Sequence, residues 1–221
     1  MPTRIILLGP PGSGKGTQAV VVKRRLGVPH ISTGDLLREA VKSGAECGEV
    51  ARGYMASGSL VPDELVLTLV RERIVAEDCL TGFLFDGFPR TEYQASELEG
   101  ILDGSSSPLD HVVELKVPEP ELVARLNGRR GCSDCGRLYH TVFNPPVRAD
   151  LCDDCGGVLE LRDDDREDTI KKRLAVYREE TLPLTEFYEL RRLLRGVDGS
   201  GAPAEVCSRI LTAVGSNDDR A

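Results

Sequence analysis

The stretch Ile5-Ile-Leu-Leu-Gly-Pro-Pro-Gly-Ser-Gly-Lys-Gly-Thr17 decides the fold that this chain of 221 residues is expected to adopt. Its four apolar residues predict a buried strand, and the residues from Thr17 to Leu26 favour a helix. The glycines between them allow backbone angles that turn several N–H groups toward one concave point. The free amides and the positive dipole end of the helix favour an anion at that point. The stretch therefore predicts a phosphate-binding loop.

Lys15 and Thr17 assign that phosphate to a nucleotide, because the ammonium reaches outer phosphates and the hydroxyl lies near the metal region. The general pattern is G-x-x-x-x-G-K-[ST], but here Gly16 occupies the hydroxyl position and offers Mg²⁺ no side-chain ligand. The alternative is a glycine-rich turn without a ligand. It is disfavoured because the glycine spacing, the lysine, the strand and the helix all agree.

Composition excludes several classes of protein. The net charge of −8 argues against a sequence-independent nucleic-acid binder. No apolar run approaches the ~20 residues that a membrane helix needs, and the N-terminus reads as a strand rather than a signal peptide, so we expect a cytoplasmic protein. Arginines gather in two short stretches, which either bind small anions or form solvated helix faces. They are Arg125, Arg129 and Arg130, then Arg162, Arg166 and Arg173.

Strand and helix patterns alternate along the chain. Strands are expected at residues 4–8, 28–32, 83–86, 111–117 and near 197–199, and helices at 14–26, 33–45, 49–56, 62–74, 91–102, 118–128, 162–180, 184–194 and 203–214. This alternation predicts an α/β fold of three layers, with a central parallel sheet covered by helices on both faces. Ligands of such sheets bind at the C-terminal ends of the strands, where the phosphate loop and Asp86 both lie. Residues 131–161 show no regular periodicity.

Four of the seven cysteines have the spacing of a metal site: Cys132-x-x-Cys135, sixteen residues, then Cys152-x-x-Cys155. A glycine follows each pair, as in two tight turns that direct thiolates inward. Four thiolates match the tetrahedral preference of structural Zn²⁺. An iron–sulfur cluster fits the count but fits the spacing less well, disulfides are disfavoured in a cytosolic enzyme, and a site without metal is the third alternative. The partnerless Cys47, Cys79 and Cys207 are expected to be small packing residues.

Four motifs together resemble the adenylate kinases, specifically the long form with a zinc-bearing lid. They are Gly9-Pro-Pro-Gly-Ser-Gly-Lys-Gly-Thr17, Ser32-Thr-Gly-Asp35, Asp86-Gly-Phe-Pro-Arg90 and Arg162-x-Asp-Asp165. The similarity covers nearly the whole chain, from Arg4 to about Ala213, and a glycine after the loop lysine is this family's own variant. The resemblance implies a P-loop core of residues 1–31, 62–124 and 162–221 with two mobile insertions. These are an AMP-binding segment, 32–61, and a zinc-bearing lid, 125–161.

The resemblance also implies the reaction: Mg²⁺-dependent, reversible transfer of the γ-phosphoryl group of ATP to AMP, giving two ADP. The implied ATP site is Gly12, Ser13, Gly14, Lys15, Gly16, Thr17, Arg125, Arg129, Leu138, Tyr139 and Gly201. The implied AMP site is Thr33, Arg38, Ser59, Leu60, Val61, Gly87, Phe88, Pro89, Arg90, Gln94, Arg162 and Arg173. The implied catalytic residues are Lys15, Arg90, Arg129, Arg162 and Arg173. The implied metal residues are Cys132, Cys135, Cys152 and Cys155 for structural zinc, and Asp86 for Mg²⁺ through water.

The chemistry explains these residue types. Phosphoryl transfer needs alignment and neutralisation of spread charge rather than a covalent nucleophile. Arginine supplies a permanent charge and a planar fork that holds two oxygens. Closure of the lid would exclude water that could otherwise consume ATP, and zinc would hold the lid as one rigid body.

Some residues carry two interpretations. Gln94 either reads the base of AMP or is a solvated polar residue. Asp164 and Asp165 either act in the site or favour a helix N-terminus. Tyr139 either contacts nucleotide or packs within the lid.

Other functions stay open at this level. A kinase for UMP, CMP or GMP is the nearest alternative, followed by a regulatory NTPase. A zinc-ribbon nucleic-acid module is disfavoured because the ribbon is locally acidic. We expect nucleotides as the ligands, adenine nucleotide homeostasis as the role, and a monomer without nucleic-acid or membrane partners.

Overall fold

Alternate residues of strand β1 (Thr3–Leu8) build two separate core layers in the computed structural model, which describes residues 3–105 and 107–215. Ile5 and Leu7 are buried in the cluster on one face of the sheet, and Ile6 and Leu8 in the cluster on the other. Successive side chains of a strand point to opposite faces, so an unbroken apolar run fits a strand covered on both sides. The expectations for residues 216–221 lie outside the described residues.

Five parallel strands form the central sheet of the described chain, in the order β2-β3-β1-β4-β8. The other four are β2 (His30–Ser32), β3 (Gly82–Asp86), β4 (His111–Lys116) and β8 (Leu194–Asp198). Leu7 pairs with Asp86 in the register of β1 and β3, so the phosphate loop and the Asp86 carboxylate leave the sheet side by side.

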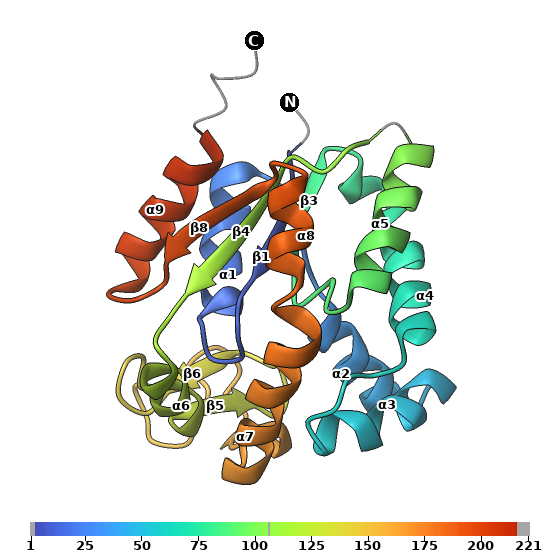
Figure 1. Cartoon of the computed structure of the whole chain (residues 1–221). Coiled ribbons are helices and arrows are strands. Elements are labelled where there is room, and N and C mark those ends of the chain that lie inside the picture. The colour runs from blue at the N-terminus through green and yellow to red at the C-terminus, as the bar shows by residue number, and fades with distance from the viewer. Residues whose placement is uncertain (1–2, 106, 216–221) are drawn as a thin grey trace.

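Helices cover both faces of this sheet, as Figure 1 shows. On one face lie α1 (Lys15–Leu26) and α9 (Pro203–Gly215), which bury Val22 and Ile210 against the sheet. On the other lie α4 (Asp63–Ile74), α5 (Glu92–Gly104) and α8 (Leu184–Leu190), which bury Leu67, Leu98 and Leu184. The expected three-layer α/β fold is confirmed.

The remaining elements gather at the C-terminal edge of the sheet, the lower part of Figure 1. They are α2 (Thr33–Ser43), α3 (Glu46–Ala56), α6 (Glu119–Asn127), α7 (Glu167–Val176) and an antiparallel sheet in the order β6-β5-β7. Its strands are β5 (Arg129–Cys132), β6 (Leu138–His140) and β7 (Leu159–Glu160). Residues 131–161, which show no regular periodicity in the sequence, thus contain short strands. Strands of two to four residues are too short to show a period in sequence.

The predicted helix over residues 162–180 differs in the structure. A 3₁₀ turn, η2 (Asp163–Asp165), comes first, Arg166 is extended, α7 follows, and a π-helical turn, η3 (Tyr177–Thr181), continues it. Asp165 breaks the helix because its buried side chain binds two arginines. Strand β8 begins three residues before the predicted 197–199, and a short 3₁₀ turn, η1 (Glu77–Cys79), precedes β3. Within the described residues, no helix is long and apolar enough to cross a bilayer.

Candidate active site

The loop between β1 and α1 is shaped by glycines that have no room for a side chain. Gly9 has φ +143° and Gly12 has φ +85°; β-carbons on them would lie 2.9 Å from Leu115 O and 2.8 Å from Leu122 O. Lys15 folds back over this loop, and its Nζ donates to Gly9 O at 2.6 Å and to Pro10 O at 3.0 Å. Backbone oxygens of the loop thus hold the Lys15 ammonium group.

Burial lowers the pKa of Lys15 to about 8, and the charges of Arg90, Arg173 and Arg129 contribute, while Asp86 opposes them. Asp86 ends β3, Arg90 lies in the loop after it, Arg129 is in β5 and Arg173 is in α7, and the charges of all four act on one lysine. A bound phosphate would supply the negative charge that this cluster lacks.

Asp86 ends β3 directly beside the phosphate loop. A β-carbon on Gly16 would lie 3.3 Å from Asp86 Oδ2, so the smallest residue stands where the carboxylate comes closest. His30 Nε2 lies 3.5 Å from the same oxygen. The glycine at position 16, where the general pattern has a hydroxyl residue, therefore has a spatial reason. A carboxylate next to a phosphate loop can accept hydrogen bonds from the waters that Mg²⁺ keeps, so Asp86 fits a role in holding that ion. Thr17, in the first turn of α1, is exposed.

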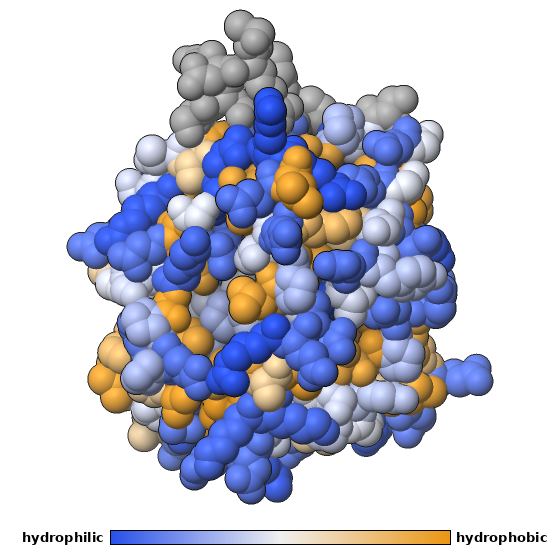
Figure 2. Space-filling model, in the orientation of Figure 1, coloured by the Kyte–Doolittle hydropathy of each residue, from blue (hydrophilic) through white to orange (hydrophobic). Residues whose placement is uncertain are grey.

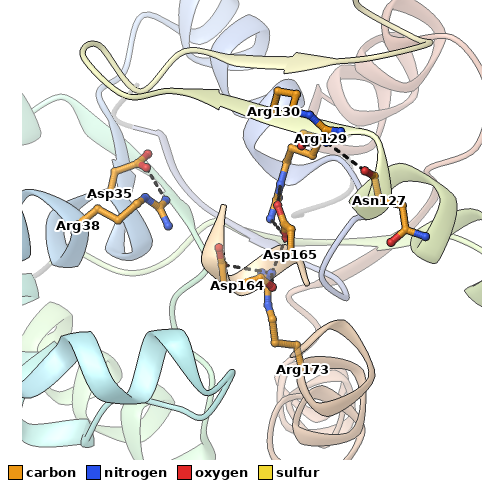
Figure 3. Close-up of polar contacts among 8 residues, drawn as sticks. All are labelled: Asp35, Arg38, Asn127, Arg129, Arg130, Asp164, Asp165 and Arg173. Atoms are coloured by element: carbon orange, nitrogen blue, oxygen red, sulfur yellow. Dashed lines mark hydrogen bonds and ion pairs between the residues drawn. The ribbon is translucent and has the colours of Figure 1, made fainter. Parts of the chain in front are cut away.

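Asp165 joins two of the implied catalytic arginines, as Figure 3 shows. Arg129 donates to both of its oxygens, Nε to Oδ2 at 2.6 Å and Nη2 to Oδ1 at 2.5 Å. Arg173 Nη1 donates to Oδ1 at 2.8 Å and lies 3.1 Å from Asp164 Oδ2. The Asp165 side chain is fully buried. One carboxylate thus aligns a lid arginine with a core arginine, and the helix N-terminus interpretation does not describe it.

Among the described residues, Arg90 and Arg162 have no ion pair with a carboxylate, and the charges of the neighbouring arginines act on both. Burial and the charge of Arg173 lower the pKa of Arg90 to about 10. Burial and the charges of Arg38 and Arg129 lower the pKa of Arg162 to about 10. Both guanidiniums stay protonated at neutral pH, so the site holds an excess of fixed positive charge.

Arg125 connects the lid side to the phosphate loop. It donates from Nη1 to Ser13 O at 3.2 Å and from Nη2 to Gly199 O at 3.0 Å, and pairs with Glu121 at 2.5 Å. Gly201, with φ +97°, follows in the same loop after β8. Leu138 of β6 reaches the phosphate loop from the lid: its Cδ1 would lie 4.0 Å from a β-carbon on Gly16.

The residues implied for AMP line the other end of the sheet edge. Thr33 Oγ1 donates to Gly87 O at 2.8 Å, and Arg90 Nε donates to the same carbonyl at 2.9 Å. The buried Gln94 accepts from Arg90 N at 2.8 Å. Arg38 pairs with Asp35 at 2.5 Å, as Figure 3 shows. Ser59, Leu60 and Val61 follow α3, and Phe88 and Pro89, joined by a cis peptide bond, lie between Gly87 and Arg90.

The four lid cysteines converge. Their Sγ atoms all lie within 4.8 Å of one another, with 3.4 Å between Cys132 and Cys155 and 3.6 Å between Cys135 and Cys152. Four sulfurs around a tetrahedral Zn²⁺ would be separated by about 3.8 Å, given the usual Zn–S bond. Gly136 and Gly156, both with positive φ, close the two turns by donating to Cys132 O and Cys152 O. The residues present therefore fit structural zinc.

Tyr139 belongs to this cysteine cluster. Its side chain is 3% exposed, and its hydroxyl accepts from Asp153 N at 2.7 Å and lies 3.5 Å from Cys152 Sγ. The hydrogen bond from that hydroxyl, together with hydrogen bonds from the Cys155 backbone and from the thiols of Cys135 and Cys155, lowers the pKa of Cys152 to about 6, against the effect of burial. The structure thus shows its side chain packed within the lid.

The lid also contacts the segment that the resemblance assigns to AMP. Lys42 of α2 donates from Nζ to Asp134 O at 3.2 Å, across 92 residues of sequence. At the end of the same segment, a β-carbon on Gly58 would lie 2.9 Å from Thr169 Cγ2 of α7. The two segments therefore meet each other and α7 at the C-terminal edge of the sheet.

Comparison with known proteins agrees with this geometry. The family model described as adenylate kinase matches residues 7–193. The chain belongs to the adenylate kinase family. It is 52% identical over 212 residues to the adenylate kinase of Syntrophotalea carbinolica, which covers 96% of the chain and 98% of the relative. It is 50% identical to that of Methanocella arvoryzae, with 96% and 98% covered, and 47% identical to that of Caldicellulosiruptor saccharolyticus, with 96% and 99% covered. The resemblance and the class of enzyme are confirmed.

Sequence reasoning missed the role of Asp63 in this adenylate kinase site and left the role of Asp165 open. Asp63 was expected only as a helix start, but it binds the Gln94 amide at 2.7 Å. Asp165 was left between two interpretations, and its partners lie 36 and 8 residues away. The separations of Asp63 from Gln94 and of Asp165 from Arg129 are too long to give a local signal in the sequence. Asp165 does belong to the motif Arg162-x-Asp-Asp165, which was a signal that could have been used.

Proposed function

We propose that the phosphate loop, Asp86 and the arginines Arg38, Arg90, Arg129, Arg162 and Arg173 form one site that binds two nucleotides end to end. The activity is that of the adenylate kinases, ATP + AMP ⇌ 2 ADP. The observation that carries the assignment is the convergence of cations from the loop after β3 (Arg90), from β5 (Arg129) and from α7 (Arg173) on Lys15, whose pKa they lower together with burial. Two nucleotides that meet through their phosphates are a ligand of matching charge and length.

The proposed ATP end consists of the loop from Gly12 to Thr17 with Arg125, Leu138, Tyr139 and Gly201. Support comes from the contacts of Arg125 with Ser13 O and Gly199 O and from the position of Leu138 over Gly16. Because the Tyr139 side chain is buried among the cysteines, its part in ATP binding is limited to its backbone and to the placement of β6.

The proposed AMP end holds the phosphate with Arg38 and Arg90 and the base with Gln94. Thr33, Gly87, Phe88, Pro89 and residues 59–61 line it. The support is that Arg90, Gln94, Thr33 and Gly87 share hydrogen bonds at one strand end. Arg129, Arg162 and Arg173 then neutralise charge on the transferring phosphoryl group.

Two metals complete the proposal. Asp86 would hold the waters of Mg²⁺, which supplies charge neutralisation between the phosphates when it is bound. Cys132, Cys135, Cys152 and Cys155 would hold Zn²⁺, which keeps the lid, residues 125–161, as one body. Elemental analysis should find about one zinc per chain, and none after Cys152→Ser.

We further propose a cytoplasmic monomer that moves residues 32–61 and the lid relative to the core and maintains the balance of adenine nucleotides. On the face that Figure 2 shows, apolar residues lie in patches between charged ones, which is the pattern of a solvated surface. Scattered apolar residues of this kind are normal on monomers.

Phosphoryl transfer from Mg²⁺·ATP to AMP, GMP, CMP and UMP, with a control lacking an acceptor, tests the function. ADP formation that requires AMP would support the proposal. Preference for another monophosphate would overturn the base contact but keep the fold and chemistry. Equal ADP release without an acceptor would indicate an NTPase.

A further inference from the structure

A hydrogen-bonded network fixes the Gln94 amide from two sides. Gln94 Nε2 donates to Asp63 Oδ1 at 2.7 Å, and Gln94 Oε1 accepts from Arg90 N at 2.8 Å. Thr91 Oγ1 donates to the other Asp63 oxygen at 3.1 Å and accepts from Gln94 N at 3.2 Å. Gln94 is only 1% exposed. Both ends of the amide therefore have a partner of definite polarity.

These partners allow a single direction of the amide. A carboxylate only accepts hydrogen bonds and a backbone N–H only donates them. If the Gln94 amide were turned by 180°, its oxygen would face the Asp63 carboxylate and its NH₂ would face the Arg90 N–H. Two hydrogen bonds would become two repulsive contacts in a buried place, where unpaired polar groups are most costly.

The amide keeps capacity for one more pair of contacts. A glutamine amide has two N–H donors and two oxygen lone pairs, and the contacts seen among the described residues use one of each. A fixed donor beside a fixed acceptor can pair with the edge of a base. Adenine presents its 6-amino donor next to the N1 acceptor, whereas a 6-oxo purine presents the reverse order.

We propose that Asp63 is a positioning residue that fixes the direction of the Gln94 amide and thereby makes the monophosphate site select 6-amino over 6-oxo purines. The inference rests on the proposed contact between Gln94 and the base of AMP. A free amide could turn to suit either edge. The Asp63 carboxylate and the Arg90 N–H together remove that freedom, and the carboxylate supplies the charge-assisted bond of the two, so part of the discrimination lies outside the residue that touches the base.

The test compares kcat/KM for AMP and for inosine monophosphate, whose base has the 6-oxo group and the N1 proton but is otherwise that of AMP. In Asp63→Leu the acceptor is lost, and the ratio should fall about tenfold, the size of one hydrogen bond to a charged group. In Asp63→Asn an oxygen still faces Gln94 Nε2, and the ratio should stay within about twofold of wild type. Both variants remove the same charge from the first turn of α4, so they match in their effect on the helix.

A merely structural role of Asp63 would lower kcat/KM for both nucleotides and leave the ratio unchanged, which would overturn the proposal. An equal fall of the ratio in the Leu and Asn variants would also overturn it, because charge rather than direction would then be responsible. Asp63→Ala repeats the comparison if the Leu variant does not fold, as judged by its Tm. Gln94→Ala tests the base contact separately from the role of Asp63. An unchanged ratio in this variant would show that Gln94 does not read the base. If the ratio changes in Gln94→Ala but not in Asp63→Leu, the base contact holds and only the role of Asp63 is wrong.

Discussion

At the scale of single residues, the site concentrates positive charge that the ligand-free protein does not neutralise. Lys15, Arg90 and Arg162 all have lowered pKa values, and burial is the largest cause for each. Cationic residues gathered to bind an anion are expected to reduce the stability of the protein in return for function. Two substitutions test how this charge affects stability: one removes a cation, Lys15, and the other removes a carboxylate, Asp165.

The first substitution is Lys15→Met. The folded pKa of Lys15, about 8, lies below the ordinary 10.5, so between these values the unfolded chain binds more protons than the folded one. The destabilisation is fully present below pH 8 and is lost as pH rises toward 10.5. Ligand-free Lys15→Met should therefore be more stable than wild type at pH 7, with the difference vanishing by about pH 10.5. Urea unfolding at several pH values measures it, and a constant difference would contradict the pKa.

The second substitution is Asp165→Ala, which leaves Arg129 and Arg173 without their shared buried carboxylate. Breaking a buried pair costs about 3–5 kcal/mol, and because both arginines remain charged we expect a loss in that range. kcat should fall at least tenfold, since Arg129 loses both of its bonds to Asp165 and Arg173 keeps only its contacts with Asp164. Asp163→Ala is the matched control, because Asp163 pairs with Arg166 at an exposed position. Equal effects of the two variants on unfolding would show that Asp165 has no special part.

At the scale of elements, the segment of α2 and α3 depends on a close helix contact. A β-carbon on Gly48 of α3 would lie 2.2 Å from Ala40 O of α2, whereas one on Gly53 of the same helix would meet nothing within 4 Å. The two glycines therefore differ in tertiary surroundings but share the same helix.

Gly48→Ala should destabilise the protein by about 1–3 kcal/mol, because the backbones of α2 and α3 must separate. Gly53→Ala should stabilise it by about 0.5–1 kcal/mol through helix propensity alone. Thermal unfolding checks both signs. A stabilising Gly48→Ala would mean that α2 and α3 do not pack as described.

At the scale of the whole molecule, two insertions touch across the site. The bond from Lys42 Nζ to Asp134 O joins α2 to the first cysteine turn of the lid. Such a contact exists only when both segments lie over the sheet edge, so it favours the arrangement in which the two segments touch.

Lys42→Ala should shift the equilibrium between separated and touching segments about threefold toward separation, the size of one exposed hydrogen bond. Fluorescence energy transfer between labels at Arg52 and Phe143, both exposed, measures the distance distribution without nucleotide. Lys171→Ala, which removes an exposed pair with Glu167 on α7, is the control. An unchanged distribution in Lys42→Ala would show that this bond does not hold the segments together.

The sequence by itself determined the features that depend on neighbours in the chain. Strand β1, the phosphate loop and α1 follow from one apolar run and the glycines after it. The spacing of the cysteine pairs predicted that the four cysteines form one cluster. The order of strands and helices also predicted the three layers, because alternation leaves few ways to bury both faces of a parallel sheet.

Only the tertiary structure decided which side chains share a partner. Asp63 meets Gln94 across 31 residues, Asp165 meets Arg129 across 36, and Lys42 meets Asp134 across 92. No local period or propensity encodes such pairs, since they arise when separate elements converge on one edge of the sheet. The turn at Asp165 was unpredictable for the same reason, because long-range contacts override the local preference of its residues, whereas the strands of the lid are too short to show a period in the sequence.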